Sequence, residues 1–168
     1  LVVIADVSGK GMSAALYMSK IQGMVQLAAH MYSSPKEMLT HVNRRIYDGI
    51  ERKSFITMVL ALFDLERGEV KICRAGHNKV LIGSDGRLEY LNAEGIGLGL
   101  ERGPVFEDTL QEVSKPLEAG GIFFFYTDGL TEAMNEQEIE LGEDSVLNLL
   151  KAKRHLTSLE IQHSVTTA

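Results

Sequence analysis

Apolar residues recur at helical spacing near the start of the chain and then give way to strand-like runs. Residues 1–6 predict a buried strand, and a helix is predicted from about Met12 to Met31. A second helix begins at Ser34-Pro35-Lys36-Glu37, with a capping Ser, Pro at the first helical position and Glu at the third. The predicted buried faces are Met12, Ala15, Leu16, Ile21, Met24, Val25, Ala28 and Met31 on the first helix, and Met38, Leu39, Val42, Ile46 and Ile50 on the second.

The middle of the chain predicts β-strands. Residues 55–63 favour a strand because they are rich in β-branched and aromatic side chains. Ser84-Asp85-Gly86-Arg87 predicts a hairpin turn, and the glycine-rich segment 95–99 predicts a loop that is either flexible or closely packed. From about Gly142 the chain is helical again. The other predicted strands are Val70–Ala75, Lys79–Gly83, Leu88–Leu91, Phe106–Val113 and Ile122–Thr127.

This order of elements indicates an α+β fold. Two helices precede a run of antiparallel strands, and further helices follow, which differs from a repeating βαβ pattern. Strands that are apolar on both faces favour two sheets packed together with helices outside. A chain of 168 residues fits one domain.

Composition narrows the range of partners. A hydrophobic share of 45% and a charged share of 24% are ordinary for a globular protein. The formal net charge of −6 disfavours nucleic acid and anionic membrane surfaces as partners. No apolar run approaches the length that spans a bilayer, and no leader peptide is expected. The single cysteine, Cys73, favours a cytoplasmic setting and is expected to be a small buried residue of a strand.

Two aspartates carry the candidate chemistry. Asp6 ends the run Leu1-Val2-Val3-Ile4-Ala5 and opens a glycine-containing turn, and Asp128 does the same after residues 122–127. Hard divalent cations need oxygen ligands on rigid supports. The pair therefore predicts a metal site built from distant parts of the chain.

Each aspartate also has a simpler interpretation. Asp6-Val7-Ser8-Gly9-Lys10-Gly11 lacks the earlier glycine and the hydroxyl residue after lysine that a Walker loop requires, so nucleotide binding is a third and weak hypothesis. Asp6 or Ser8 could support the start of the first helix, and Asp128 could close a turn. A carboxylate at the end of a buried strand is costly unless it is paired or metal-bound, which favours the metal interpretation for both.

Four segments in order resemble the PPM metal-dependent serine/threonine phosphatases, in the bacterial SpoIIE/RsbU branch. The resemblance covers nearly the whole chain, and residues 97–99 fit a further glycine segment between the last two. Four motifs in this order are highly specific, although no single one is decisive. The segments are Ala5-Asp6-Val7-Ser8-Gly9-Lys10-Gly11-Met12-Ser13-Ala14-Ala15-Leu16, Phe55-Ile56-Thr57-Met58, Arg74-Ala75-Gly76-His77-Asn78 and Tyr126-Thr127-Asp128-Gly129-Leu130-Thr131-Glu132-Ala133.

The resemblance implies an αββα four-layer sandwich with a site for two Mn²⁺ or Mg²⁺ ions. In the family pattern Asp6 bridges both ions, the Val7 backbone carbonyl binds one of them, and Asp128 holds the second. A metal-bridging hydroxide attacks the phosphorus of a phosphoserine or phosphothreonine, so no protein nucleophile is needed.

The chain also departs from the family pattern. A ligating Asp upstream of the first strand and another that opens a final strand are absent, so residues 1–168 are expected to be one catalytic domain lacking its N-terminal and C-terminal strands. We therefore expect this chain to bind metal weakly and to be weak or inactive as a catalyst. Exposed sheet edges predict a homodimer or aggregation.

His77 and Lys10 are the remaining candidates near the site, and the substrate-binding residues stay unknown. His77 could be a general acid or could close a turn, and the Pro that commonly follows Asn78 in the family is Lys79 here. Lys10 could face the phosphate or be a solvated loop lysine.

The resemblance further implies a phosphorylated regulatory protein as substrate, such as an anti-sigma-factor antagonist. It also implies an upstream sensor domain that acts through the first two helices. The competing hypothesis is a non-catalytic regulatory module with the same fold, which would bind a partner through these helices.

Overall fold

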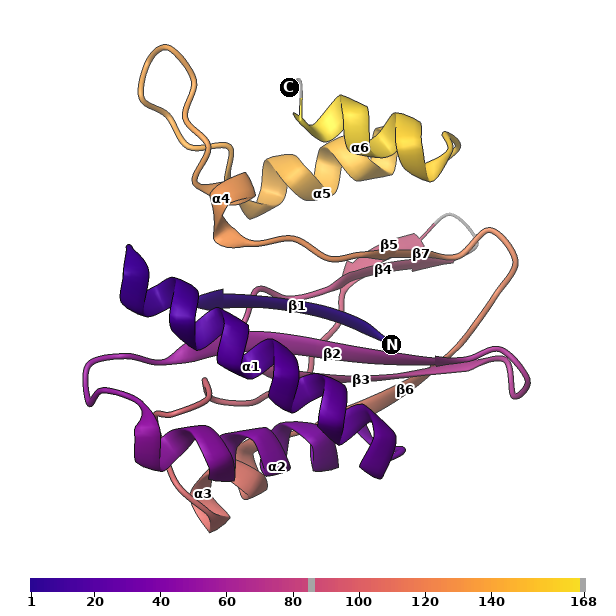
Figure 1. Ribbon diagram of the computed structural model, residues 1–168. Helices are drawn as coiled ribbons and strands as arrows, with labels where there is room; N and C mark the ends of the chain where they lie inside the picture. The colour runs from indigo at the N-terminus through magenta and orange to yellow at the C-terminus, as the bar shows by residue number, and fades with distance from the viewer. Residues whose placement is uncertain (85–86, 167–168) are drawn as a thin grey trace. The chain divides into compact units, whose positions relative to one another are not determined.

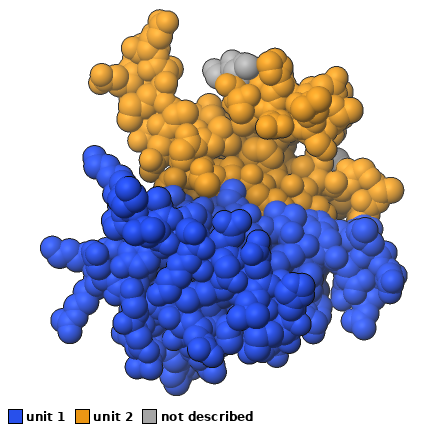
Figure 2. All heavy atoms as spheres, viewed as in Figure 1, with its two compact units in different colours: residues 1–77, 92–117 blue, residues 78–91, 118–168 orange. Residues whose placement is uncertain are grey.

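The chain divides into two compact units, and each unit is built from two stretches of sequence. The computed structural model describes residues 1–84 and 87–166 (Figure 1). Unit 1 consists of Leu1–His77 and Asn92–Leu117, and unit 2 consists of Asn78–Leu91 and Glu118–Ala168 (Figure 2). Each unit holds one antiparallel sheet and its own helices.

Unit 1 is a four-stranded sheet in the order β1-β2-β3-β6, with helices α1 and α2 on one face (Figure 1). Its core lies between this face and the helices, where residues such as Val25, Leu39 and Leu60 are buried. The elements of unit 1 are β1 (Val2–Val7), α1 (Met12–Met31), α2 (Pro35–Ile46), the 3₁₀ turn η1 (Tyr47–Gly49), β2 (Ile56–Asp64), β3 (Glu69–Ala75), α3 (Pro104–Thr109) and β6 (Glu112–Pro116).

The register between β1 and β2 decides which residues face the helices. Val7 pairs with Ile56, and both belong to the helix-side core. Asp6 pairs with Thr57. Because successive side chains of a strand point to opposite faces, Asp6 and Thr57 lie on the face that is turned away from α1 and α2.

The N-terminus of α2 confirms the predicted cap and adds a partner from β6. Ser34 Oγ accepts a hydrogen bond from Glu37 N at 3.3 Å. It donates to Glu112 Oε2 at 2.5 Å, and Lys36 N donates to the same oxygen at 3.0 Å. The Glu112 carboxylate thus lies where a helix presents unpaired N–H groups and the positive end of its dipole.

The predicted buried faces of the two helices are only partly correct. α1 buries one narrow face, which packs against α2 and β1. Residues 12 and 16 lie on the side of α1 opposite to this buried face, because successive residues of an α-helix are rotated by about 100° around its axis. Ile50 follows the end of α2 but still packs against the core. The buried residues of α1 are Ile21, Val25 and Ala28, and the exposed large apolar ones are Met12, Leu16, Leu27 and Met31.

The strand predicted at Phe106–Val113 is wrong. Residues Pro104–Thr109 form the short helix α3, and the strand β6 begins only at Glu112. Gly103 has a φ of +68°, and Pro104 takes the first helical position, so the chain enters a helix here. Phe106 and Leu110 are both buried, and their i, i+4 spacing was a helical signal inside an apolar run.

The glycine-rich segment 95–99 is closely packed. A Cβ on Gly95 would lie 2.0 Å from the Arg74 carbonyl oxygen, so only glycine fits there. Gly76 N donates to Gly95 O at 2.9 Å, and Ile56 and Leu98 exchange two backbone hydrogen bonds of 3.0 and 2.8 Å. The segment is therefore attached to β2 and to the end of β3.

Unit 2 is a three-stranded antiparallel sheet in the order β5-β4-β7 with helices packed against it. Ser84 pairs with Arg87, but Asp85 and Gly86 of the predicted hairpin turn lie outside the described residues. Its strands are β4 (Leu81–Ser84), β5 (Arg87–Tyr90) and β7 (Ile122–Phe124), and its helices are α4 (Asp128–Thr131), α5 (Gly142–Lys153) and α6 (Ser158–Thr166). The core residues are Leu81, Leu88, Tyr126, Val146, Leu150, Ile161 and Val165.

In the part of the chain that the structure describes, none of the helices has the length and apolarity needed to cross a membrane.

Asn43 generates the first prediction, because it is a buried polar group on α2. Its Oδ1 accepts from Gly99 N at 2.9 Å, and its Nδ2 donates to Glu101 O at 2.9 Å. Replacing Asn43 with Ala removes both part-buried hydrogen bonds and leaves the Gly99 N–H and the Glu101 carbonyl short of a partner. We expect Asn43→Ala to lower the free energy of unfolding by about 2–4 kcal/mol in urea titrations. The control Arg45→Ala, at an exposed position of the same helix, should change it by less than about 0.5 kcal/mol. Equal losses in the two variants would contradict this role.

Candidate functional site

Asp6 lies at the end of β1, on a backbone that is fixed on both sides. The Asp6 side chain is exposed, while the next residue, Val7, is 6% exposed and anchored in the core. Ser8 and Phe55 then exchange two hydrogen bonds. Ser8 N donates to Phe55 O at 2.9 Å, and Phe55 N donates to Ser8 Oγ at 2.7 Å. A carboxylate is thus presented to solvent on a rigid strand end, as a hard cation requires.

The turn after Asp6 has the conformation that its glycines allow. Gly9 and Gly11 have φ values of +94° and +85°, a region that glycine occupies without steric cost. Lys10 lies exposed between them, in the loop that follows β1. Ser8 is used as a strand clamp, so the interpretation of Ser8 as a helix cap is wrong: the N-cap of α1 is Gly11, with no side-chain cap.

His77 is a buried member of unit 1. It is 4% exposed, and its Nδ1 lies 2.8 Å from Thr57 Oγ1. Arg74 fixes the backbone here, since its Nη1 donates to His77 O at 2.7 Å and its Nε to Ala93 O at 2.8 Å. Burial lowers the pKa of Arg74, an effect that the nearby Glu94 opposes.

Sequence reasoning missed Thr57 and Arg74 as supports of this region. A signal existed for Thr57, because it is the single hydroxyl residue in the apolar run of residues 55–63. The role of Arg74 depends on carbonyl groups that a one-dimensional pattern does not place.

Asp128 belongs to unit 2 and begins α4 a few residues after β7. Its side chain is exposed. Its backbone oxygen accepts from Glu132 N at 2.8 Å and from Thr131 Oγ1 at 3.1 Å, so the turn that carries it is held by its main chain. The strand ends at Phe124, three residues earlier than predicted.

The structure groups Asp6, Val7, Lys10 and His77 in unit 1 and places Asp128 in unit 2. Two carboxylates and a carbonyl are donors of the chemistry that Mg²⁺ and Mn²⁺ prefer. Across residues 1–84 and 87–166, no three His, Cys, Asp or Glu side chains form a group that could hold a metal ion.

Cys73 is fully buried in β3, which confirms the expectation that it packs as a small apolar residue. Burial, with a smaller contribution from the negative charge of Glu112, raises the pKa of its thiol to about 12. A thiol of this kind is neutral and unreactive near neutral pH.

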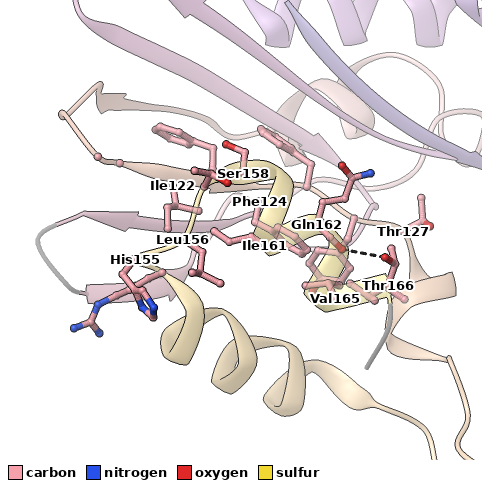
Figure 3. A pocket seen from close by; sticks show the side chains of 18 residues that line it. Ile122, Phe124, Thr127, His155, Leu156, Ser158, Ile161, Gln162, Val165 and Thr166 are labelled. Carbon is pink, nitrogen blue, oxygen red and sulfur yellow. Dashed lines mark hydrogen bonds between the residues drawn. The ribbon is translucent and has the colours of Figure 1, made fainter.

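A cavity of about 920 Å³ lies in unit 2 between β7 and α6 (Figure 3). None of the described residues that line it carries a carboxylate, the donor that a hard cation prefers. Sequence reasoning gave no sign of it, because β7 was expected to be buried. The labelled lining residues are Ile122, Phe124, Thr127, His155, Leu156, Ser158, Ile161, Gln162, Val165 and Thr166.

Comparison with known families identifies relatives along the whole chain. The model of the family described as "Stage II sporulation protein E (SpoIIE)" matches residues 1–168. The phosphoserine phosphatase RsbU of Bacillus subtilis (strain 168) is 29% identical over 137 residues, which is 80% of this chain and 40% of RsbU. The chain therefore spans well under half the length of this relative.

Solved structures share the fold at low sequence identity. The structure of the SiaA-PP2C domain of Pseudomonas aeruginosa superimposes on this chain with a TM-score of 0.81 and 18% sequence identity. The match covers 98% of this chain and 64% of the SiaA chain. The catalytic domain of the serine/threonine protein phosphatase PstP, in complex with two manganese ions, matches with a TM-score of 0.67 and 13% sequence identity. This match covers 98% of this chain and 78% of the PstP chain. The expected α+β fold of the PPM phosphatases, with antiparallel sheets and packed helices, is thereby confirmed.

Burial of Cys73 predicts a pH-dependent difference in stability. The folded-state pKa is raised, so the unfolded thiol ionises first as pH rises above its ordinary value, and the free energy of unfolding falls toward pH 12. We expect wild type to lose more stability than Cys73→Ala between about pH 8 and pH 10 in urea titrations. Rapid modification of Cys73 by a thiol reagent in the folded protein would contradict this burial.

Proposed function

Because the chain belongs to the SpoIIE family of PPM-type serine/threonine phosphatases, we propose that residues 1–168 form one phosphatase domain that hydrolyses phosphoserine or phosphothreonine. The family match over the whole chain supports the class of reaction. The single structural observation that carries the proposal is the exposed Asp6 carboxylate, presented on a strand end clamped by Ser8 and Phe55.

We propose Asp6, the Val7 carbonyl and Asp128 as ligands of Mn²⁺ or Mg²⁺. These positions match the family motifs residue by residue, and PstP, which shares the fold, holds two manganese ions. Bound divalent cations lower the pKa of water and stabilise negative charge on a transferring phosphoryl group. The chain's own contribution is to hold these oxygen donors on hydrogen-bonded backbone, at the end of β1 and at the start of α4.

We propose that the positive charge of Lys10, close in sequence to Asp6, attracts the phosphoryl group of the substrate. Lys10 is exposed in the loop that follows β1 and Asp6, and a lysine ammonium binds phosphate as a point charge. Cys73 is fully buried, so it takes no part as a nucleophile.

We propose a phosphorylated regulatory protein as the substrate, such as an anti-sigma-factor antagonist, and regulation by a sensor domain elsewhere in the protein. Support comes from RsbU, a phosphoserine phosphatase of the same branch. The exposed apolar residues of α1 favour a second candidate function, a non-catalytic module that binds a partner through this helix.

Substitution of the proposed ligands tests the function. We propose that the 168-residue chain is at most a weak catalyst, and Asp6→Asn and Asp128→Asn should each abolish any Mn²⁺-dependent hydrolysis of p-nitrophenyl phosphate that it shows, since each removes a ligand charge. Asp108→Asn, at an exposed position of α3, should leave the rate unchanged. A wild-type rate above background that is unchanged in both ligand variants would contradict the proposed ligand roles.

Metal removal gives an independent expectation. Treatment with excess EDTA should abolish hydrolysis, and added Mn²⁺ or Mg²⁺ should restore it, because the proposed ligands are oxygen donors and the proposed attacking group is a metal-activated water. Hydrolysis that persists in EDTA would show that the activity does not depend on these cations.

A further inference from the structure

A buried histidine contacts the cross-strand partner of Asp6. His77 Nδ1 lies 2.8 Å from Thr57 Oγ1, and Thr57 is directly opposite Asp6 in the β1–β2 register. Opposite residues of an antiparallel pair extend from the same face, with Cβ atoms roughly 4.5–5.5 Å apart. The side chains of Thr57 and Asp6 are therefore cross-strand neighbours on one face of the sheet.

The backbone that carries His77 is fixed without help from the imidazole. Gly76 has a φ of +69° and bridges to Met58, and a Cβ on Gly76 would lie 2.8 Å from Gly97 N. Arg74 Nη1 donates to the carbonyl of His77. A substitution of the His77 side chain therefore removes the imidazole contact while these backbone contacts can stay in place.

The hydrogen-bonding capacity of threonine decides how the contact can affect Asp6. A threonine hydroxyl has one donor proton and two acceptor lone pairs, and a carboxylate only accepts. If Nδ1–H donates to Oγ1, the hydroxyl proton of Thr57 remains available to the carboxylate. If Nδ1 accepts instead, that proton is used and the hydroxyl presents only lone pairs, which repel a carboxylate.

We infer that His77 is a positioning residue that acts through Thr57 on Asp6. Its Nδ1–H holds the Thr57 hydroxyl so that the hydroxyl proton is directed toward the Asp6 carboxylate, which restricts the orientation of that carboxylate. The inference rests on the proposed metal role of Asp6. Partners of this kind orient metal-ligating groups, and their loss typically costs about 10–100-fold in metal affinity.

Metal affinity of matched variants tests the inference. Mn²⁺ binding to the chain is measured by water-proton relaxation, which detects weak sites and needs no substrate. We expect His77→Ala and Thr57→Val to raise the Mn²⁺ dissociation constant about 10–100-fold. His77→Asn keeps an N–H near the Nδ1 position and Thr57→Ser keeps the hydroxyl, so both should stay close to wild type. His41→Ala breaks a comparable histidine–hydroxyl contact, His41 Nδ1 to Tyr32 Oη at 3.1 Å, and should not change Mn²⁺ affinity.

A double-mutant cycle separates this inference from the function on which it rests. In an Asp6→Asn background, His77→Ala should have no further effect on Mn²⁺ affinity, because the residue acts through Asp6. If Asp6→Asn weakens binding but His77→Ala alone does not, His77 is only a structural residue and the proposed function stands. If Asp6→Asn leaves binding unchanged, the metal role of Asp6 and this inference both fall.

The direction of the hydrogen bond gives a readout in the metal-free protein. Nitrogen-15 spectra of the His77 imidazole should show a proton on Nδ1. An unprotonated Nδ1 would mean that Thr57 donates to His77, and the inference would be overturned. Unfolding measurements on each variant identify any that fails to fold, and the His77→Asn and Thr57→Ser variants then carry the comparison.

Discussion

The pairing of β1 with β2 is the constraint on which the rest of unit 1 depends. In the observed register, Val7 and Ile56 face the helices, and Asp6 and Thr57 face the other way. A slip of one residue would exchange these faces and turn a carboxylate into the apolar core, which is strongly unfavourable. The reciprocal hydrogen bonds between Ser8 and Phe55 close the strand pair at the end where Asp6 lies.

Local patterns were sufficient for most elements and failed where two patterns overlapped. The limits of α1, the cap of α2 and the long strand β2 follow from spacing, capping residues and β-branched content. The segment 106–113 was misread because its apolar residues fit a strand as well as a helix, and Gly103 and Pro104 decided the outcome. Burial along α1 could not be assigned from spacing, because exposed residues such as Met12, Leu16 and Leu27 are as apolar as the buried ones.

The candidate site was predictable as a set of residue types and much less as a set of contacts. The sequence predicts Asp6 and Asp128 at strand ends, and the structure exposes both, Asp6 near the end of β1 and Asp128 at the start of α4. The contact between His77 and Thr57 joins residues twenty positions apart, and it requires both the β2–β3 register and the turn at Gly76. Neither requirement can be derived from the order of residue types.

The interleaving of the two units along the chain has a consequence for synthesis on the ribosome. β4 and β5 of unit 2 are made before β6 of unit 1, and β7 is made after it. Neither sheet can be completed by a continuous stretch of nascent chain, so each waits for a strand that emerges later. Such long-range pairings close slowly because loop entropy must be overcome first. Incomplete sheets with open edges therefore persist during translation, when unpaired strands are most exposed to association with other chains.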